Sequence, residues 1–247
     1  MHEDEKPAIR RLPLFQQAAE QTFDSLMRIA SVHNVPPRRH LIRRGTRPAV
    51  LHVLMEGAVE LHAGWNGNEA VMAVLRPVSC FILAACVTDL PHLMAARTLE
   101  QARIITIPAG DLRGAMRQDA GLAMAAMTEL AGSYRSMVRQ SMNLKLRNSR
   151  ERLAAWLLRQ SQGLGEMPSF VLPVEKRHLA SYLGMTPESL SRTLRQLQDS
   201  GVVVEGARVT ITDRDGLMAL ARPDPLMDAG HMDEDSCESR LPGHIPA

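Results

Sequence analysis

Cysteine is scarce in this chain, and the three that it has, Cys80, Cys86 and Cys237, lack the close spacing of zinc ligands. An iron–sulfur cluster held by cysteine alone usually takes four thiolates, so three cannot supply one. We therefore expect no iron–sulfur cluster. We expect Cys80 and Cys86 to be small buried hydrophobic residues.

No hydrophobic run is long enough to span a bilayer, and no basic segment followed by an apolar one opens the chain. We expect a soluble cytoplasmic protein without membrane contact. The sequence also shows no nucleophile paired with a base, no metal motif and no glycine-rich phosphate loop, which argues against an enzyme. Because the formal net charge over 247 residues is only +2, any basic surface must be local.

One segment near the C-terminus has the pattern of two short helices joined by a tight turn. Gly184 lies at the turn, where a bend between helices favours glycine. Thr186 is a good N-cap, and Pro187 suits the first position of the second helix. Both helices have an apolar face, made by Leu179, Ala180 and Leu183 in the first and by Leu190, Leu194 and Leu197 in the second. This pattern predicts a helix-turn-helix.

The outward face of the second helix carries Glu188, Ser191, Arg192 and Arg195, at i, i+3, i+4 and i+7. Recognition helices present such residues to base edges in the major groove. Arginine bonds guanine O6 and N7, glutamate accepts from cytosine N4, and serine tolerates either. The alternative is a solvated helix with ordinary surface charges. The turn glycine, the N-cap and the paired apolar faces favour DNA binding.

Two short β-like runs follow this segment, at residues 202–204 and 208–211, with a turn at 205–207. They predict a β-hairpin wing beside the helix-turn-helix. A last short helix is expected over residues 213–221. Residues 222–247 are rich in proline and acidic residues, with little periodicity, and predict a disordered acidic tail.

The N-terminal half has a different residue pattern, in which β-like runs are separated by turns. The runs are residues 40–43, 50–55, 58–62, 70–75 and 102–108. Turns are indicated at Gly45, Gly57 and Asn66-Gly67, and the last pair is the strongest hairpin signal. Short strands at close intervals predict a small antiparallel barrel or jelly roll over residues 12–109.

Residues 110–147 are expected to form one long helix, because no residue there interrupts the pattern. Its apolar positions alternate in steps of four and three, which is a heptad seam. The seam residues are Ala123, Met127, Leu130, Tyr134, Met137, Ser141 and Leu144. They predict a homodimer in which this helix pairs with its copy, whereas the alternative is a helix packed against its own domain. Residues 148–221 would then form the winged helix-turn-helix domain.

This order of elements closely resembles the CRP/FNR family of bacterial transcription regulators over about residues 14–221. Residues 188–192 match the E-x-x-S-R pattern of its FNR-like branch, which includes the FixK, NnrR and DNR types. The resemblance implies an α+β chain with an N-terminal cyclic-nucleotide-binding-like antiparallel β-barrel, or jelly roll. A long dimerisation helix and a C-terminal winged helix-turn-helix would follow.

The resemblance also implies partners and contacts. Double-stranded DNA carrying an inverted repeat of TTGAT half-sites and RNA polymerase would be the partners, and low-oxygen or nitrogen-oxide metabolism the controlled process. The implied base-reading residues are Glu188, Ser191 and Arg192. The implied contacts to the DNA backbone are Lys176, Arg177, Thr186, Ser189 and Arg195.

The sensory half departs from the cyclic-AMP-binding pattern. The cassette glutamate, arginine and serine of those members fall on Leu83, His92 and Leu93. A cyclic phosphate needs a cation and hydrogen-bond donors, and two leucines remove most of them. The threonine–serine pair that meets adenine falls on Met137 and Val138. We therefore expect that cyclic AMP is not the effector.

Two interpretations of the sensor stay open. The family includes haem-dependent gas sensors, so haem is one, with His92 as first candidate for the iron ligand. Weaker candidates are Cys80, Cys86, His33, His40, His52 and His62. The other is a regulator without an effector, like FixK-type members that are controlled by abundance. A more distant alternative is a small-molecule-binding module whose helix-turn-helix contacts protein.

Overall fold

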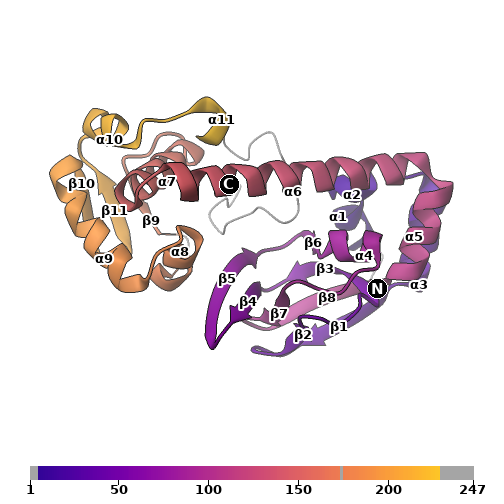
Figure 1. The fold of residues 1–247 in the computed structure, drawn as a ribbon. Helices are drawn as coiled ribbons and strands as arrows, with labels where there is room; N and C mark the ends of the chain where they lie inside the picture. Colours follow the sequence, from indigo (N-terminus) through magenta and orange to yellow (C-terminus); the bar gives the residue numbers. More distant parts are fainter. Residues whose placement is uncertain (1–4, 173–174, 229–247) are drawn as a thin grey trace. The chain divides into compact units, whose positions relative to one another are not determined.

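The structure is a computed structural model that describes residues 5–172 and 175–228 (Figure 1). Of these, the residues up to Tyr134 form one compact unit, the N-terminal unit, and those from Arg135 form a second, the C-terminal unit. The boundary falls within helix α6, Ala120–Leu146. Within the described chain no helix is both long and apolar enough to cross a membrane.

The N-terminal unit is an α+β domain built on two four-stranded antiparallel sheets. Its helices are α1 (Lys6–Arg10), α2 (Pro13–Gln16), α3 (Glu20–Ile29), α4 (Leu83–Thr88) and α5 (Ala109–Gln118), followed by the start of α6. Its strands are β1 (Ser31–Val35), β2 (His40–Ile42), β3 (Val50–Glu56), β4 (Val59–Trp65), β5 (Asn68–Leu75), β6 (Ser79–Phe81), β7 (Ala95–Thr98) and β8 (Ala102–Pro108). The strand orders are β1-β8-β3-β6 and β2-β7-β4-β5. The predicted antiparallel β-barrel is confirmed.

Alternation along the strands divides the hydrophobic residues between two cores. On β8, Ile104 joins a cluster with Leu61 of the other sheet, so this core lies between the sheets. The next residue, Ile105, joins a cluster with Phe15 and other helical residues, so the opposite face of the same sheet is covered by helices. Successive side chains of a strand point to opposite faces, and here both faces are buried.

The Asn66-Gly67 turn forms as predicted. Both residues have positive φ, 50° and 80°, and Trp65 pairs with Asn68 across the β4–β5 hairpin. Strands β1, β6 and β7 were not predicted. Each has only three to five residues and weak alternation, and each is held by ladder pairing with a longer neighbour distant in sequence.

The prediction of one continuous helix over residues 110–147 is wrong, because Asp119 separates α5 from α6. Asp119 has extended backbone angles, and its carboxylate accepts from the backbone N–H of Leu122 at 3.0 Å and of Ala19 at 2.8 Å. The first bond is an N-cap of α6. Gly121 follows, where a Cβ would overlap the carbonyl of Gln17. The break thus depends on contacts with a distant segment.

The C-terminal unit contains the end of α6 and a compact set of helices beside a three-stranded sheet of order β10-β11-β9. Its elements are α7 (Ser149–Gly163), β9 (Ser169–Val171), α8 (Lys176–Tyr182), α9 (Pro187–Gln196), a 3₁₀ turn (Gln198–Ser200), β10 (Val202–Glu205), β11 (Arg208–Ile211), α10 (Arg214–Ala221) and α11 (Pro225–Asp228). The predicted helix-turn-helix, wing and last helix are present. Strand β9, which pairs with β11, was not predicted.

The prediction that disorder begins at residue 222 is wrong for residues 222–228. Helix α11 ends at Asp228, whose carboxylate lies 2.5 Å from Nη2 of Arg147 and 2.9 Å from Nη1 of Arg159. The side chains of Arg147 and Asp228 are only 5% and 10% exposed. Ion pairs with Arg147, which directly follows α6, and with Arg159 of α7 therefore fix this segment. Residues 229–247 of the predicted tail lie outside the described part of the chain.

Candidate nucleic-acid interface and candidate effector pocket

Helix α9 is set by its cap and by the turn before it. The Thr186 hydroxyl accepts from the backbone N–H of Ser189 at 3.2 Å, and Leu190 and Leu194 are buried. Gly184 has φ +63°, and a Cβ there would overlap the side chain of Leu144 on α6. The positive φ therefore favours glycine at this turn, whereas the overlap concerns only the flexible end of the Leu144 side chain.

The opposite face of α9 is open to solvent. Glu188, Arg192 and Arg195 are exposed, and Ser191 is half-buried. Within the described chain the guanidinium of Arg192 makes no hydrogen bond or ion pair, whereas Nε of Arg195 donates to the Ser191 carbonyl at 3.4 Å. Hydrogen bonds from its own backbone N–H and from Thr186 lower the pKa of Glu188, so this carboxylate is ionised at neutral pH. This face thus presents both a free cation and an acceptor.

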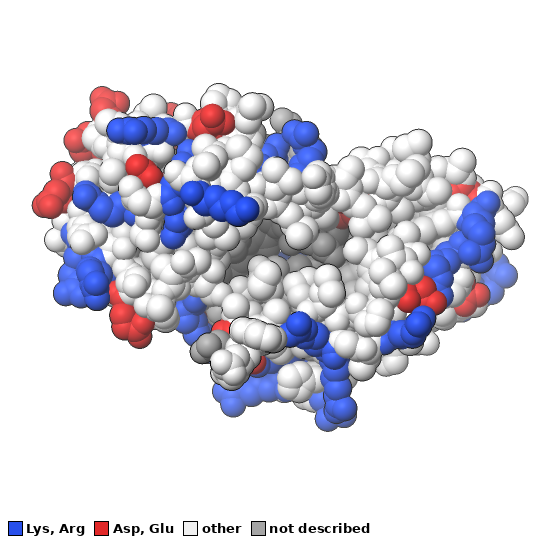
Figure 2. Space-filling view, viewed as in Figure 1, with Lys and Arg blue, Asp and Glu red and all other residues white. Residues whose placement is uncertain are grey.

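The other predicted DNA contacts also lie at helix starts. Lys176 and Arg177 occupy the first turn of α8, and both are exposed. Arg177 pairs with Glu175 at 2.8 Å, but both side chains are largely solvated, so the pair is weak and can open. Figure 2 shows basic side chains interspersed with acidic ones over the position of α9, in keeping with the near-neutral net charge.

The helix-turn-helix is fastened to α6 and α7 by side chains that bind the end of α8. Gln140 of α6 donates to the Tyr182 carbonyl at 2.5 Å. Arg152 of α7 donates from Nε to the Leu183 carbonyl at 2.9 Å and from Nη1 to the Arg147 carbonyl at 2.5 Å. These bonds satisfy carbonyls that a helix end leaves without internal partners.

Most of the predicted heptad seam on α6 is exposed. Met127, Tyr134, Met137 and Leu144 are open to solvent, and Met137 is 72% exposed. Leu130 differs, because it packs against the helical core of the N-terminal unit. The seam therefore includes one residue used by its own domain and a row of large apolar residues without cover in a single chain.

The three predicted effector positions do not share one environment. Leu83 and His92 are buried, whereas Leu93 is 81% exposed and so does not line an enclosed pocket. The backbone N–H of His92 donates to the Thr46 carbonyl at 2.9 Å. Its Nδ1 atom is buried, with no hydrogen-bond partner in the described chain. Burial lowers the pKa of His92, so the ring is neutral at pH 7.

His52 was a weaker candidate from the sequence, but the structure places it beside a cavity. Its ring stacks on Phe81 with 5.1 Å between centroids, and its buried Nδ1 likewise has no partner in the described chain. Burial, with the nearby charges of His92 and His33, lowers its pKa to about 4. The cavity, about 370 Å³, is lined by His33, Asn34, Val35, Pro36, Arg39, His40, Leu41, His52, Ile104 and Thr106. Cys80 and Cys86 are buried, as predicted.

Two domain families match this chain. The cyclic nucleotide-binding domain matches residues 32–119, and the Crp-like helix-turn-helix domain matches residues 151–220. An anaerobic regulatory protein of Haemophilus influenzae is 31% identical over 211 residues, which span 81% of this chain and 80% of that protein. A fumarate and nitrate reduction regulatory protein of Salmonella typhimurium is 30% identical over 135 residues, 53% of this chain and 54% of that protein.

Solved structures share the fold. FixK2 from Bradyrhizobium japonicum superposes with a TM-score of 0.64 at 21% identity, covering 79% of this chain and 99% of that one. A CooA mutant from Carboxydothermus hydrogenoformans has a TM-score of 0.58 at 14% identity, covering 80% and 90%. At these identities the similarity concerns the fold alone.

Proposed function

The chain belongs to the CRP/FNR family of transcription regulators, and from that premise we propose that it binds, as a homodimer, an inverted repeat of TTGAT-type half-sites. It is a DNA-binding regulator and not an enzyme. We further propose that it controls genes of low-oxygen or nitrogen-oxide metabolism and acts through RNA polymerase. The anaerobic and nitrate-reduction roles in the names of its relatives support this choice.

The open face of α9 is the observation that carries the DNA-binding proposal. Arg192 is exposed and unpaired in the described chain, so it can meet a guanine without first breaking an internal contact. Glu188 is ionised and can accept from a cytosine amino group. Lys176, Arg177, Thr186, Ser189 and Arg195 would then bind the DNA backbone and fix the register of the helix.

The exposed seam of α6 supports the dimer. Large apolar side chains in a row, uncovered in one chain, indicate an interface. Pairing α6 with its copy would bury Tyr134 and Met137 and relate two recognition helices by a two-fold axis. Such dimers read half-sites about 34–36 Å apart, one turn of DNA. A sensor that changes the packing of the paired α6 helices would therefore change this spacing.

A duplex with the full inverted repeat should bind more tightly than one with a single half-site by roughly 10²-fold or more, because the second contact becomes intramolecular. Met137→Glu places a charge in the seam and should reduce full-site binding to the half-site level. Met218→Glu, at an exposed methionine of α10, is the matched control and should keep the difference. Fluorescence anisotropy and sedimentation measure both effects, and a Met137→Glu chain that stayed dimeric with full-site affinity would contradict the proposed seam.

We propose haem as the effector, with His92 as the iron ligand. The fit rests on the buried Nδ1 atom without a partner and on the lowered pKa, which keeps the imidazole neutral and able to bind iron. Bound haem would supply an iron that takes up nitric oxide or carbon monoxide. Leu83 is buried in the core that the helices cover and Leu93 is exposed, so neither is proposed as a haem contact.

Reconstitution with haemin tests the ligand. We expect a sharp Soret band that shifts with nitric oxide and carbon monoxide, is lost in His92→Ala and is kept in His33→Ala, a control at an exposed histidine of the same unit. A spectrum like that of free haemin, with DNA binding indifferent to haem and gas, would instead favour a regulator without an effector. The apolar side chains that fill the space between the two sheets are the observation in favour of that second candidate.

A further inference from the structure

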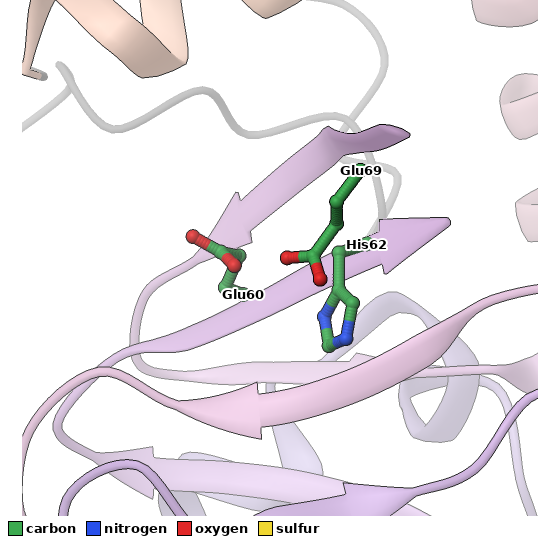
Figure 3. A group of neighbouring side chains, drawn as sticks. All are labelled: Glu60, His62 and Glu69. Atoms are coloured by element: carbon green, nitrogen blue, oxygen red, sulfur yellow. The ribbon is translucent and has the colours of Figure 1, made fainter. Parts of the chain in front are cut away.

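A second group of potential ligands lies on the β4–β5 hairpin, on residues that take no part in the proposed DNA or haem binding. Glu60 and His62 are two positions apart on β4, so they point to the same face of the sheet. Glu69 on the adjacent strand β5 joins them (Figure 3). One ligand atom from each of the three side chains lies within 4.8 Å of the others.

Burial sets this group apart from ordinary surface carboxylates. Glu60 is fully buried and His62 is 6% exposed, whereas the side chain of Glu69 is half open to solvent. Nδ1 of His62 is buried, with no hydrogen-bond partner in the described chain. Buried polar atoms in proteins nearly always have a hydrogen-bond partner or a ligand. This nitrogen is therefore suited to a ligand that enters from the Glu69 side.

Arg97 of β7 pre-arranges the two carboxylates. It pairs with Glu60 across the β4–β7 ladder, and its Nη2 lies 2.5 Å from Oε1 of Glu60 and 2.6 Å from Oε1 of Glu69. Both carboxylates are therefore held within reach of the His62 imidazole.

We propose that Glu60, His62 and Glu69 bind a divalent transition-metal ion of the Zn²⁺ type. Imidazole nitrogen with two carboxylate oxygens is a donor set that Zn²⁺ accepts, whereas Mg²⁺ and Ca²⁺ favour oxygen alone. Three protein ligands leave a coordination position for water or for a further ligand on the solvent side. The ion would link β4 to β5 and so give the N-terminal unit a metal-dependent input separate from His92.

The test uses the full-length, haem-free chain after treatment with a chelator, titrated with Zn²⁺ by calorimetry. We expect one Zn²⁺ per chain at this site and a loss of affinity of at least about tenfold in Glu69→Gln and in His62→Ala. Glu69 is exposed, so Glu69→Gln keeps the fold even if a change at buried His62 does not. His33→Ala is the matched control and should bind as the unaltered chain does.

Equal Zn²⁺ affinity in the unaltered chain and in Glu69→Gln would overturn the proposal, and so would the absence of Zn²⁺ binding to the unaltered chain. Neither result depends on haem or DNA. Failure here is therefore distinguishable from failure of the proposed regulator function.

Discussion

Replacing Arg192 with alanine is expected to weaken binding to the TTGAT inverted repeat by about 1–3 kcal/mol, roughly 10- to 100-fold, for each half-site whose guanine no longer meets an arginine. The reason is local: Arg192 lies exposed on the outward face of α9 and has no internal partner in the described chain. Its removal should therefore leave the fold unchanged while deleting the hydrogen bonds to the base. Anisotropy at one fixed salt concentration, with cognate and scrambled duplexes, measures the loss.

Arg195→Ala is the matched control, because it removes the same charge three residues further along α9. Because Arg195 is a proposed contact to the DNA backbone, its replacement should weaken binding to both duplexes alike. It should also reduce the slope of log K against log salt by about one. Arg192→Ala should instead lower the preference for the cognate duplex. If Arg192→Ala weakened both duplexes equally, its proposed role in base reading would be wrong.

Asp228→Ala is expected to destabilise the C-terminal unit by about 3–5 kcal/mol, since removing one partner of a buried ion pair leaves an uncompensated charge. Asp228 bonds both Arg147 and Arg159, and the Arg147 side chain is almost fully buried. As a control, Glu166→Ala breaks the more exposed pair with Arg214 and should cost less than about 1 kcal/mol. A cost for Asp228→Ala as small as that of the control would contradict a stabilising role for the buried pair.

Tryptophan fluorescence can follow this unit alone. Trp156 is buried in α7, and Trp65 is exposed on the hairpin of the other unit. In a Trp65→Phe background, urea unfolding monitored at Trp156 reports the C-terminal unit.

The same pair sets a pH dependence. Burial alone would raise the pKa of Asp228, but hydrogen bonds from Arg147 and the Asp224 backbone N–H, with the charges of Arg159 and Arg147, hold it below its ordinary 3.8. A carboxylate with a lowered folded-state pKa stabilises the fold fully above its unfolded value and loses that contribution as pH falls through the folded value. The difference between the unaltered chain and Asp228→Ala should therefore be complete at neutral pH and shrink below about pH 4.

The sequence predicted the elements whose determinants lie close together along the chain. Gly184, Thr186 and the apolar spacing of α9 act within about a dozen residues, and so do the Asn66-Gly67 hairpin and the wing. These features are local enough for periodicity and turn chemistry to reveal them.

The missed features depend on partners distant in sequence. Asp119 ends α5 partly through a bond to Ala19, and β9 exists through its ladder with β11. Asp228 lies in an acidic, proline-rich stretch, yet Arg147, just after α6, and Arg159 of α7 order it. For the effector positions, the sequence did not show that His92 is buried while its neighbour Leu93 is exposed, because the path of a loop decides both; nor did it show that His52 of β3 borders the cavity.

The hydrogen bonds from Gln140 and Arg152 to the end of α8 couple the last turns of α6 to the helix-turn-helix. They join the end of α6 and the start of α7 directly to the helix-turn-helix. A rotation of these last turns of α6 would therefore be expected to carry α9 with it. Such a rotation would move Arg192 relative to a bound base pair without any unfolding of the helix-turn-helix.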